Sequence, residues 1–203
     1  MRLEAVASAV GTGDERWLPW VTMGAMRPLL LVVTGRPGAG KSTLSVPLGV
    51  ALDRLVLSRD RVKVEMASGG AVPDNATATR EFFDRLGALL VQGISCVADA
   101  AFQHAVWQPH LAVLEPLADV RVVVCDVPLA VARERRLARI AMDPGWLALH
   151  PDPVLEAAST TGDWPIDEPY VAPSLGYPML TLDTTRPVET SLADVLSWLE
   201  SRD

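Results

Sequence analysis

The alternation of apolar and polar positions divides the chain into short strand-like runs separated by helix-like segments. Five apolar runs have the length of buried strands, at residues 29–34, 54–58, 94–99, 120–125 and 178–183. Longer segments with apolar residues at helical spacing predict helices at residues 41–52, 78–92, 106–117, 128–141 and 189–201. Strands that alternate with helices are typical of a parallel sheet covered by helices on both faces. The pattern therefore predicts an α/β fold.

Three features do not fit this alternation. Residues 1–27 show no clear period and are interpreted as an extension ahead of a domain that spans residues 28–203. Pro47 lies inside the first predicted helix, where it removes a backbone donor, so that helix is expected to be kinked or short. Residues 140–185 contain no lysine or arginine and carry many acidic, proline and aromatic residues. This interval is either an irregular surface excursion or a substrate wall, whose negative charge and aromatic rings would suit a cationic or polyhydroxylated molecule.

A complete phosphate loop follows the first predicted strand. Residues 35–42 read Gly-Arg-Pro-Gly-Ala-Gly-Lys-Ser and match the pattern G-x-x-x-x-G-K-[ST]. Glycines allow such a loop to curl so that successive N–H groups point at one anion, and the helix that follows adds its positive N-terminal end. The dinucleotide-binding pattern G-x-G-x-x-G fails, because Pro37 takes the place of its second glycine. We therefore expect a nucleoside triphosphate, ATP or GTP, to bind here.

The residue types in this loop suggest separate roles. Lys41 can reach the outer phosphates, and the Ser42 hydroxyl can ligate Mg²⁺. The expected nucleotide-binding residues of the loop are Gly35, Gly38, Ala39, Gly40, Lys41, Ser42 and Thr43.

Two aspartates lie where predicted strands end, at the edge of the sheet that also carries the phosphate loop. Asp60 follows the second strand, within the sequence Ser-Arg-Asp-Arg-Val-Lys at residues 58–63. It could accept a proton from a substrate hydroxyl that attacks the γ-phosphorus, or it could cap the helix that follows. Asp99 ends the third strand. It could orient Mg²⁺ or its water shell, contact the substrate, or be only a turn residue, and its position favours one of the functional roles.

Four arginines fall within seven residues of the helix predicted at 128–141: Arg133, Arg135, Arg136 and Arg139. Spacings of three and four residues place pairs of them on shared helix faces. Phosphoryl transfer needs cationic donors on the oxygens of the transferring group, and the planar fork of arginine suits this task better than lysine. The alternative is a solvated basic face. Because the chain is otherwise acidic, we favour the functional interpretation, with Arg135 and Arg139 as the catalytic pair and Arg136 as a further nucleotide ligand.

Composition restricts the partners and the compartment. The chain has 203 residues and a formal net charge of −7, so its surface as a whole should repel nucleic acid and anionic membranes. No apolar run approaches a membrane span, and we see no secretory leader pattern. Cys96 and Cys125 fall in central strands that flank the first strand in the usual phosphate-loop kinase order, about 9–10 Å apart and too far for a disulfide. We expect two buried free thiols in a cytoplasmic protein. The histidines at 104, 110 and 150 lack metal-ligand spacing and are expected to be surface or core residues.

Taken together, the segments at residues 35–43, 58–63, 97–102 and 125–139 resemble one group of small phosphate-loop kinases. The group includes chloramphenicol phosphotransferase, the kinase domain of polynucleotide kinase and the zeta toxins, and the likeness covers most of residues 28–200. It implies a P-loop NTPase fold with a five-stranded parallel sheet in the order 2-3-1-4-5 and a lid helix that carries arginines. It also implies that Asp60 acts on the acceptor hydroxyl and that the lid arginines bind the triphosphate.

The chain departs from this group at one position. Polynucleotide kinases carry an arginine three residues after the catalytic aspartate, where this chain has Lys63. We expect Lys63 at the substrate site together with Asp60 and Asp99, but a lysine offers a point charge rather than a bidentate fork. This difference weakens the case for a nucleic-acid end as the target.

These features predict a Mg²⁺-dependent phosphotransferase that transfers the γ-phosphate of ATP to a hydroxyl of a small molecule. By analogy with chloramphenicol phosphotransferase the acceptor could be an antibiotic, and a sugar or nucleoside fits equally well. Two other functions stay open. A kinase of nucleic-acid 5′-hydroxyls predicts a basic groove. A nucleotide-binding regulatory or toxin-like module predicts a large exposed apolar patch and no acceptor-dependent turnover.

Overall fold

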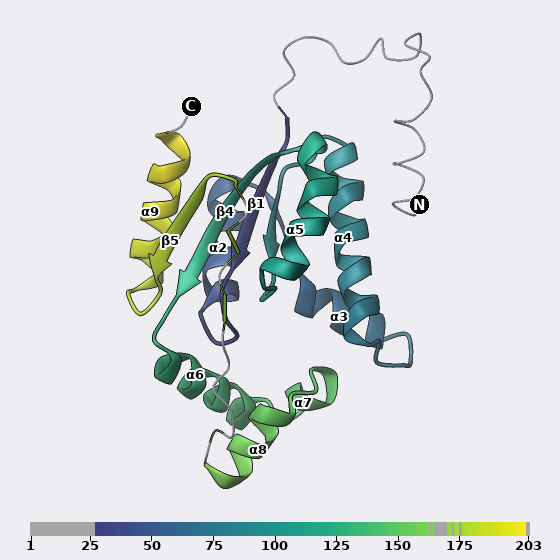
Figure 1. Cartoon of the computed structure of the whole chain (residues 1–203), viewed down its shortest axis with the longest axis vertical. Helices are drawn as coiled ribbons and strands as arrows, with labels where there is room; N and C mark the ends of the chain where they lie inside the picture. Colours follow the sequence, from purple (N-terminus) through teal and green to yellow (C-terminus); the bar gives the residue numbers. More distant parts are fainter. Residues whose placement is uncertain (1–26, 163, 165–169, 172, 175, 202–203) are drawn as a thin grey trace.

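The computed structural model describes residues 27–201 apart from 163, 165–169, 172 and 175. Within these residues, five parallel strands form one sheet in the order β2-β3-β1-β4-β5 (Figure 1). This order confirms the predicted α/β fold of the P-loop NTPase type. The extension expected at residues 1–27 lies outside the described residues except for Arg27.

The strands begin and end within two residues of their predicted positions. They are β1 (Leu29–Thr34), β2 (Leu55–Ser58), β3 (Cys96–Asp99), β4 (Asp119–Asp126) and β5 (Met179–Asp183). The helices are α2 (Lys41–Leu52), α3 (Arg59–Ala67), α4 (Asn75–Val91), α5 (His104–Leu114), α6 (Leu129–Met142), α7 (Trp146–Leu149), α8 (Pro153–Thr161) and α9 (Val188–Glu200), and a 3₁₀ turn (Glu115–Leu117) follows α5. The five helices predicted from spacing are all present, whereas α3, α7 and α8 were not predicted.

Helix α2 answers the question that Pro47 raised. The helix runs through Pro47 without a break and has 12 residues in all; the residue that follows it, Asp53, has a positive φ of 52°. The short-helix alternative is therefore wrong, and tertiary packing overrides the local cost of the proline. Leu44 and Leu48, on either side of Pro47, are both buried against the sheet.

The acidic interval at residues 140–185 is more regular than the excursion interpretation implied. Helices α7 and α8 lie in it, and Asp152 begins α8 by accepting a hydrogen bond from the Leu155 N–H at 3.0 Å. Pro153 follows at the first helical position, where its missing N–H and fixed φ are tolerated. The irregular interpretation therefore needs correction for residues 146–161.

The core lies on both faces of the sheet. Strand β1 is central, and its alternate residues enter two separate clusters, because successive side chains of a strand point to opposite faces. Leu30 and Val32 pack with α4 and α5, while Leu31 and Val33 pack with α2 and α9. Burial on both sides explains why this strand reads as a continuous apolar run rather than an alternating one.

The two cysteines occupy the strands on either side of β1. Cys96 is on β3 and Cys125 on β4, and both are buried and free. Burial raises the pKa of each thiol to about 12.

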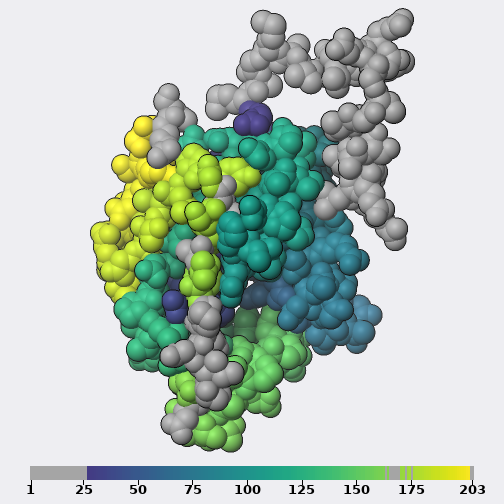
Figure 2. All heavy atoms as spheres, viewed as in Figure 1, coloured from purple at the N-terminus to yellow at the C-terminus, as the bar shows by residue number. Residues whose placement is uncertain are grey.

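Helices α6, α7 and α8 lie beyond the carboxyl ends of the strands, where the arrowheads point in Figure 1. In the space-filling view the green segment with α7 and α8 forms the lower end of the molecule (Figure 2). None of the helices in the described part of the chain is long and apolar enough to cross a membrane. The end of the sheet that carries α6, α7 and α8 also carries the residues of the candidate site.

Candidate functional site

The phosphate loop connects β1 to α2 and depends on glycine. Gly38 has a φ of +85°, and a Cβ atom there would overlap the carbonyl oxygen of Ala132 on α6. Gly40 has a φ of +84° and directly precedes α2. Residues with a Cβ atom rarely adopt either of these backbone conformations. The loop therefore holds its curl against α6 through backbone contact, and the first N–H groups of α2 have no intrahelical acceptor.

Ser42 and Asp99 form an oxygen pair at the start of α2. The Ser42 hydroxyl donates to Asp99 Oδ2 at 2.7 Å, and the Asp99 side chain is buried at the end of β3. Burial raises the pKa of Asp99, while the hydrogen bond from Ser42 and the charge of Lys41 act in the opposite direction.

This pair fits a magnesium ion. Mg²⁺ prefers hard oxygen ligands and is commonly held by one or two protein groups together with phosphates and waters. Ser42 and Asp99 offer one hydroxyl and one carboxylate beside the phosphate loop. The described residues contain no group of three or more His, Cys, Asp or Glu side chains that could hold a metal by themselves. The donor set therefore suits an ion shared with a bound triphosphate.

Lys41, near the end of the loop, lines the same cavity as Asp60 and Asp99. Its ammonium donates to the Arg36 carbonyl at 3.1 Å and so folds back over the loop. Burial lowers the pKa of Lys41, and Asp99 opposes that shift most strongly among its neighbours. A partly desolvated ammonium at this place is poised to contact anionic oxygens.

Asp60 sits in the first turn of α3, directly after β2. Ser58 is the N-cap residue of this helix. Among the described residues the Asp60 carboxylate accepts no hydrogen bond from a backbone N–H; it accepts from Arg59 Nη1 at 3.4 Å. This geometry speaks against the cap interpretation. The Asp60 side chain is 46% exposed.

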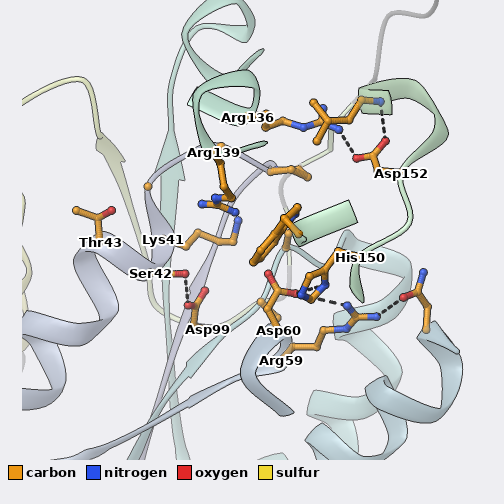
Figure 3. A pocket seen from close by; sticks show the side chains of 18 of the residues that line it. Lys41, Ser42, Thr43, Arg59, Asp60, Asp99, Arg136, Arg139, His150 and Asp152 are labelled. Carbon is orange, nitrogen blue, oxygen red and sulfur yellow. Dashed lines mark hydrogen bonds and ion pairs between the residues drawn. The ribbon is translucent and has the colours of Figure 1, made fainter. Parts of the chain in front are cut away.

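One cavity of about 290 Å³ brings most of these groups together (Figure 3). Its lining includes Lys41 and Ser42 from the loop end, Asp60 and Asp99 from the strand ends, and Arg136 and Arg139 from α6. Trp146, His150 and Asp152 close it from the side of α7 and α8. The predicted catalytic carboxylate and the predicted phosphate ligands thus face a single space.

The four arginines of α6 point in different directions. Arg136 is buried and forms an ion pair with Asp152, and Arg139 lies over the Trp146 ring at 4.8 Å. Arg135 donates to the Thr184 carbonyl at 2.9 Å and does not line the cavity with Asp60. Arg133 lies over the Trp164 ring at 4.9 Å and lines a separate outer hollow. Only two of the four therefore reach the cavity that Asp60 lines.

A second cavity, of about 460 Å³, lies on the other side of the phosphate loop. It is lined by Gly38, Gly40 and Thr43 of the loop region and by Arg135 and Arg139 of α6, with further residues near β5 and α9: Thr184, Arg186, Val188 and Ser191. Arg139 and the loop border both cavities. An extended ligand could therefore lie across the loop with one end in each.

Besides Arg135, three of the predicted residues do not line the shared cavity, the one that Asp60 lines: Lys63, Gly35 and Ala39. Lys63 is buried, and its ammonium donates to Asn75 Oδ1 at 2.9 Å. Burial lowers its pKa, and the nearby Arg59 adds to that shift. Gly35 and Ala39 are loop residues that are buried rather than facing the cavity. Gly35 packs so closely on the Cys125 carbonyl that a Cβ atom would overlap it.

The sequence analysis did not single out Arg59, Asn75 or His150 as cavity residues, whereas Trp146 lies in the acidic interval for which a substrate wall was one interpretation. Arg59 and Asn75 line the cavity beside Asp60, and Arg59 Nη2 donates to Asn75 Oδ1 at 2.7 Å. Trp146 and His150 stack with ring centroids 4.0 Å apart. Asp152 followed by Pro153 is typical of a helix start and would have predicted α8.

The sheet order, the phosphate loop and the arginine-bearing helix define a P-loop NTPase-like fold of the kinase type. Residues 30–144 match the family model AAA_33, an AAA domain, and the chain belongs to this family. No protein with a curated description matches the chain.

Solved structures of small kinases are similar to the chain over most of its length. A "putative kinase" from Chloroflexus aurantiacus J-10-fl is 26% identical with a TM-score of 0.68, and the match covers 89% of this chain and 100% of that one. The Mycobacterium tuberculosis APS kinase CysC, solved with AMPPNP and APS, is 22% identical with a TM-score of 0.56 and coverages of 87% and 99%. These likenesses confirm the kinase-like fold.

A chain of the Pnkp1/Rnl/Hen1 RNA repair complex is also similar. It is 20% identical with a TM-score of 0.53, and the match covers 70% of this chain and 49% of that one. The resemblance to small phosphate-loop kinases that the sequence predicted is therefore confirmed.

Proposed function

We propose that this protein is a Mg²⁺-dependent phosphotransferase that moves the γ-phosphate of ATP to a hydroxyl group of a small molecule. One observation carries the proposal: phosphate-loop Lys41 and Ser42 line the same cavity as the Asp60 carboxylate. A nucleotide-binding switch has no need of a carboxylate at that point, whereas a kinase needs a base that faces its phosphate ligands. We assign the activity to the domain predicted at residues 28–203.

The phosphate end of the site is built from the loop and α2. The backbone N–H groups from Gly38 to Thr43 and the Lys41 ammonium would hold the phosphates, and Ser42 with Asp99 would hold Mg²⁺. An ion held there would neutralise negative charge on the phosphates. The adenosine would lie in the second cavity, beside Arg135 and Thr184.

The acceptor end is built around Asp60. The acceptor oxygen attacks the γ-phosphorus while its proton passes to the Asp60 carboxylate, and the bond from the γ-phosphorus to the β–γ bridging oxygen breaks with its electron pair on ADP. Arg139 borders both cavities and would neutralise charge on the transferring group. Arg135 would act on the nucleotide side only.

The size and walls of the cavity favour a small acceptor. Its volume of about 290 Å³ is at the lower end of the range for small-molecule sites. The Trp146–His150 stack, Pro151 and Leu155 supply apolar surface on the side of α7 and α8. Hydroxylated antibiotics, sugars and nucleosides are the acceptor classes that we expect, in a cytoplasmic enzyme with access to ATP.

The experiment that tests the proposal is a screen for acceptor-dependent ADP formation. The purified protein is incubated with Mg-ATP and a panel of hydroxylated antibiotics, sugars, nucleosides and a 5′-hydroxyl oligonucleotide, and products are analysed by mass spectrometry for one added phosphate. Phosphate on a small molecule supports the proposal. Phosphate on the oligonucleotide alone, or ADP formation that no acceptor stimulates, contradicts it.

Replacement of the predicted base gives the corresponding mutational prediction. Asp60→Asn removes the proton acceptor but keeps the size and the polar contacts, so kcat should fall by about 10²–10⁴-fold. Binding of Mg-ATP, measured by calorimetry, should persist because Asp60 is not a phosphate ligand. Asp53→Asn is the control, since this exposed residue at the end of α2 lies outside both cavities. An unchanged kcat in Asp60→Asn removes Asp60 from the mechanism.

A further inference from the structure

His150 is a cavity residue with an environment that sequence reasoning did not anticipate. It follows α7, its side chain is only 10% exposed, and its ring stacks on Trp146 with an interplanar angle of 24°. It comes from a segment 90 positions away from Asp60 in the sequence, and yet the two side chains line the same cavity (Figure 3).

The contacts of Asp60 fall on one of its two oxygens. His150 Nδ1 lies 3.8 Å from Asp60 Oδ1, and Arg59 Nη1 lies 3.4 Å from that same oxygen. Among the described residues, none donates a hydrogen bond to Asp60 Oδ2. Arg59 and His150 therefore both contact Oδ1, and Oδ2 is left for a ligand.

Arg59 and His150 approach Asp60 from different parts of the fold. Arg59 is the preceding residue, and its second amino group is anchored on Asn75 of α4 at 2.7 Å. His150 is held by its stack on Trp146. Arg59 donates a hydrogen bond to the carboxylate, and His150 adds a polar contact at 3.8 Å. Two independently anchored groups restrict the rotation of a carboxylate more than one group would.

The state of the imidazole fits a donor at Nδ1. Burial lowers the pKa of His150, Asp60 opposes that shift, and Lys63, Arg59 and Arg139 add to it, so the environment favours the neutral ring. A neutral ring carries one N–H. A hydrogen on Nδ1 would face a carboxylate oxygen, whereas Nε2 is buried and has no hydrogen-bond partner among the described residues.

The same turn of chain is tied to the arginine helix. Asp152, two residues after His150, pairs with Arg136 of α6 and also begins α8 through the Leu155 N–H. Arg139, one helical turn from Arg136, lies over Trp146. The position of His150 is therefore linked to the helix that carries the proposed phosphate ligands.

We propose that His150 is a positioning residue for Asp60: its Nδ1 carries a hydrogen that faces Oδ1 across 3.8 Å, and together with Arg59 this polar contact turns Oδ2 toward the acceptor hydroxyl. The inference rests on the proposed function for its catalytic consequence and on geometry for the pairing itself. The acceptor proton passes to Oδ2, while the Nδ1 proton of His150 stays where it is. His150 does not itself touch the reacting atoms.

The kinetic test compares two substitutions of His150. His150→Phe keeps a ring that can stack on Trp146 but removes the donor, and kcat should fall by about tenfold to a hundredfold with KM for ATP unchanged. His150→Asn places an amide N–H near the position of Nδ1 and should recover most of the lost kcat. His104→Phe is the matched control, since His104 lines neither cavity, and it should behave as the wild type. If His150→Phe and His150→Asn lower kcat equally, or if only KM for ATP changes, the positioning role is wrong.

A spectroscopic test does not depend on any acceptor. The chain has three histidines, so ¹⁵N-detected imidazole spectra of the full-length protein can be assigned by the loss of one signal in His150→Asn. We expect His150 to be the Nδ1–H tautomer in the wild type and to revert to Nε2–H in Asp60→Ala. An Nε2–H tautomer in the wild type overturns the pairing, even if the protein proves to be a kinase. Conversely, the expected tautomer together with a negative acceptor screen would refute the proposed function and leave the pairing intact.

Discussion

The two walls of the site are built on different principles. The phosphate-loop wall is made by residues that are adjacent in sequence, and backbone contact holds it in shape: Gly38 leaves no room for a Cβ against Ala132, and Gly35 none against Cys125. The opposite wall, on α7 and α8, is made by side chains: the Trp146–His150 stack and the ion pair of Arg136 with Asp152. The first wall is a fixed geometry suited to one common ligand, a triphosphate. The second wall can change by substitution of single side chains.

The largest effect should come from disrupting the backbone contact between Gly38 of the first wall and Ala132 of α6. Gly38→Ala forces a Cβ into the Ala132 carbonyl and a side chain into a positive φ, so nucleotide binding should weaken by about a hundredfold or more. The strain should also lower the free energy of unfolding by about 1–3 kcal/mol. Calorimetric titration with Mg-ATP and urea unfolding measure the two effects.

Gly93→Ala is the matched control for that substitution. Gly93 has a similar φ of +74°, but no heavy atom lies within 4 Å of its Cβ position. It should show the conformational cost alone and bind Mg-ATP normally. Equal nucleotide affinity in the two variants would show that the loop does not depend on the backbone contact with α6.

An intermediate effect should come from the ion pair of the second wall. Arg136→Gln leaves Asp152 without its partner, and because Asp152 is 31% exposed, water reduces the loss to roughly 1–3 kcal/mol of unfolding free energy. KM for the acceptor should rise, because Asp152 and His150 share one turn of chain.

Arg133→Gln isolates this effect from the aromatic contact. Arg133 and Arg136 both lie over the Trp164 ring, at 4.9 and 5.0 Å, but Arg133 lines the outer hollow and not the shared cavity. Arg133→Gln should therefore leave both kinetic constants as in the wild type. If the two variants raise KM to the same extent, the cation–π contacts rather than the ion pair shape the wall.

The smallest effect concerns the sheet behind the first wall. Because burial raises the pKa of Cys96 and Cys125 to about 12, both thiols are protonated at pH 8, where an ordinary thiol is partly ionised. Ellman's reagent should react with neither in the native protein and with both in guanidinium. Rapid labelling of the native protein would indicate that the sheet opens far more readily than its packing implies.

The sequence predicted the first wall much better than the second, for a physical reason. The phosphate loop, α2 and the strand ends with Asp60 and Asp99 follow from local pattern and from the rule that parallel strands end at one edge. His150 and Asp152 reach the site only through the docking of α7 and α8, which no local pattern describes. The arginines show the same limit: spacing placed four on one helix, but only packing decides that Arg136 and Arg139 face the cavity and Arg133 does not.

Some of the misses had a signal in the sequence. Asp74 begins α4 by accepting from the Thr77 N–H at 2.6 Å, and the sequence Asp-Asn-Ala-Thr at residues 74–77 would have moved the predicted start of that helix back to its true position. Lys63 had none. Its placement behind the cavity depends on the hydrogen bond to Asn75, a residue on another helix.

A structure of the protein with Mg²⁺ and a non-hydrolysable ATP analogue tests the central claim most directly. We predict that the triphosphate lies along the phosphate loop with the nucleoside beside Arg135, and that the γ-phosphate enters the cavity between Lys41 and the Asp60 carboxylate. A γ-phosphate that points away from Asp60, or a nucleoside that fills the cavity on the Asp60 side, would contradict the assignment of this protein as a kinase with Asp60 as its base.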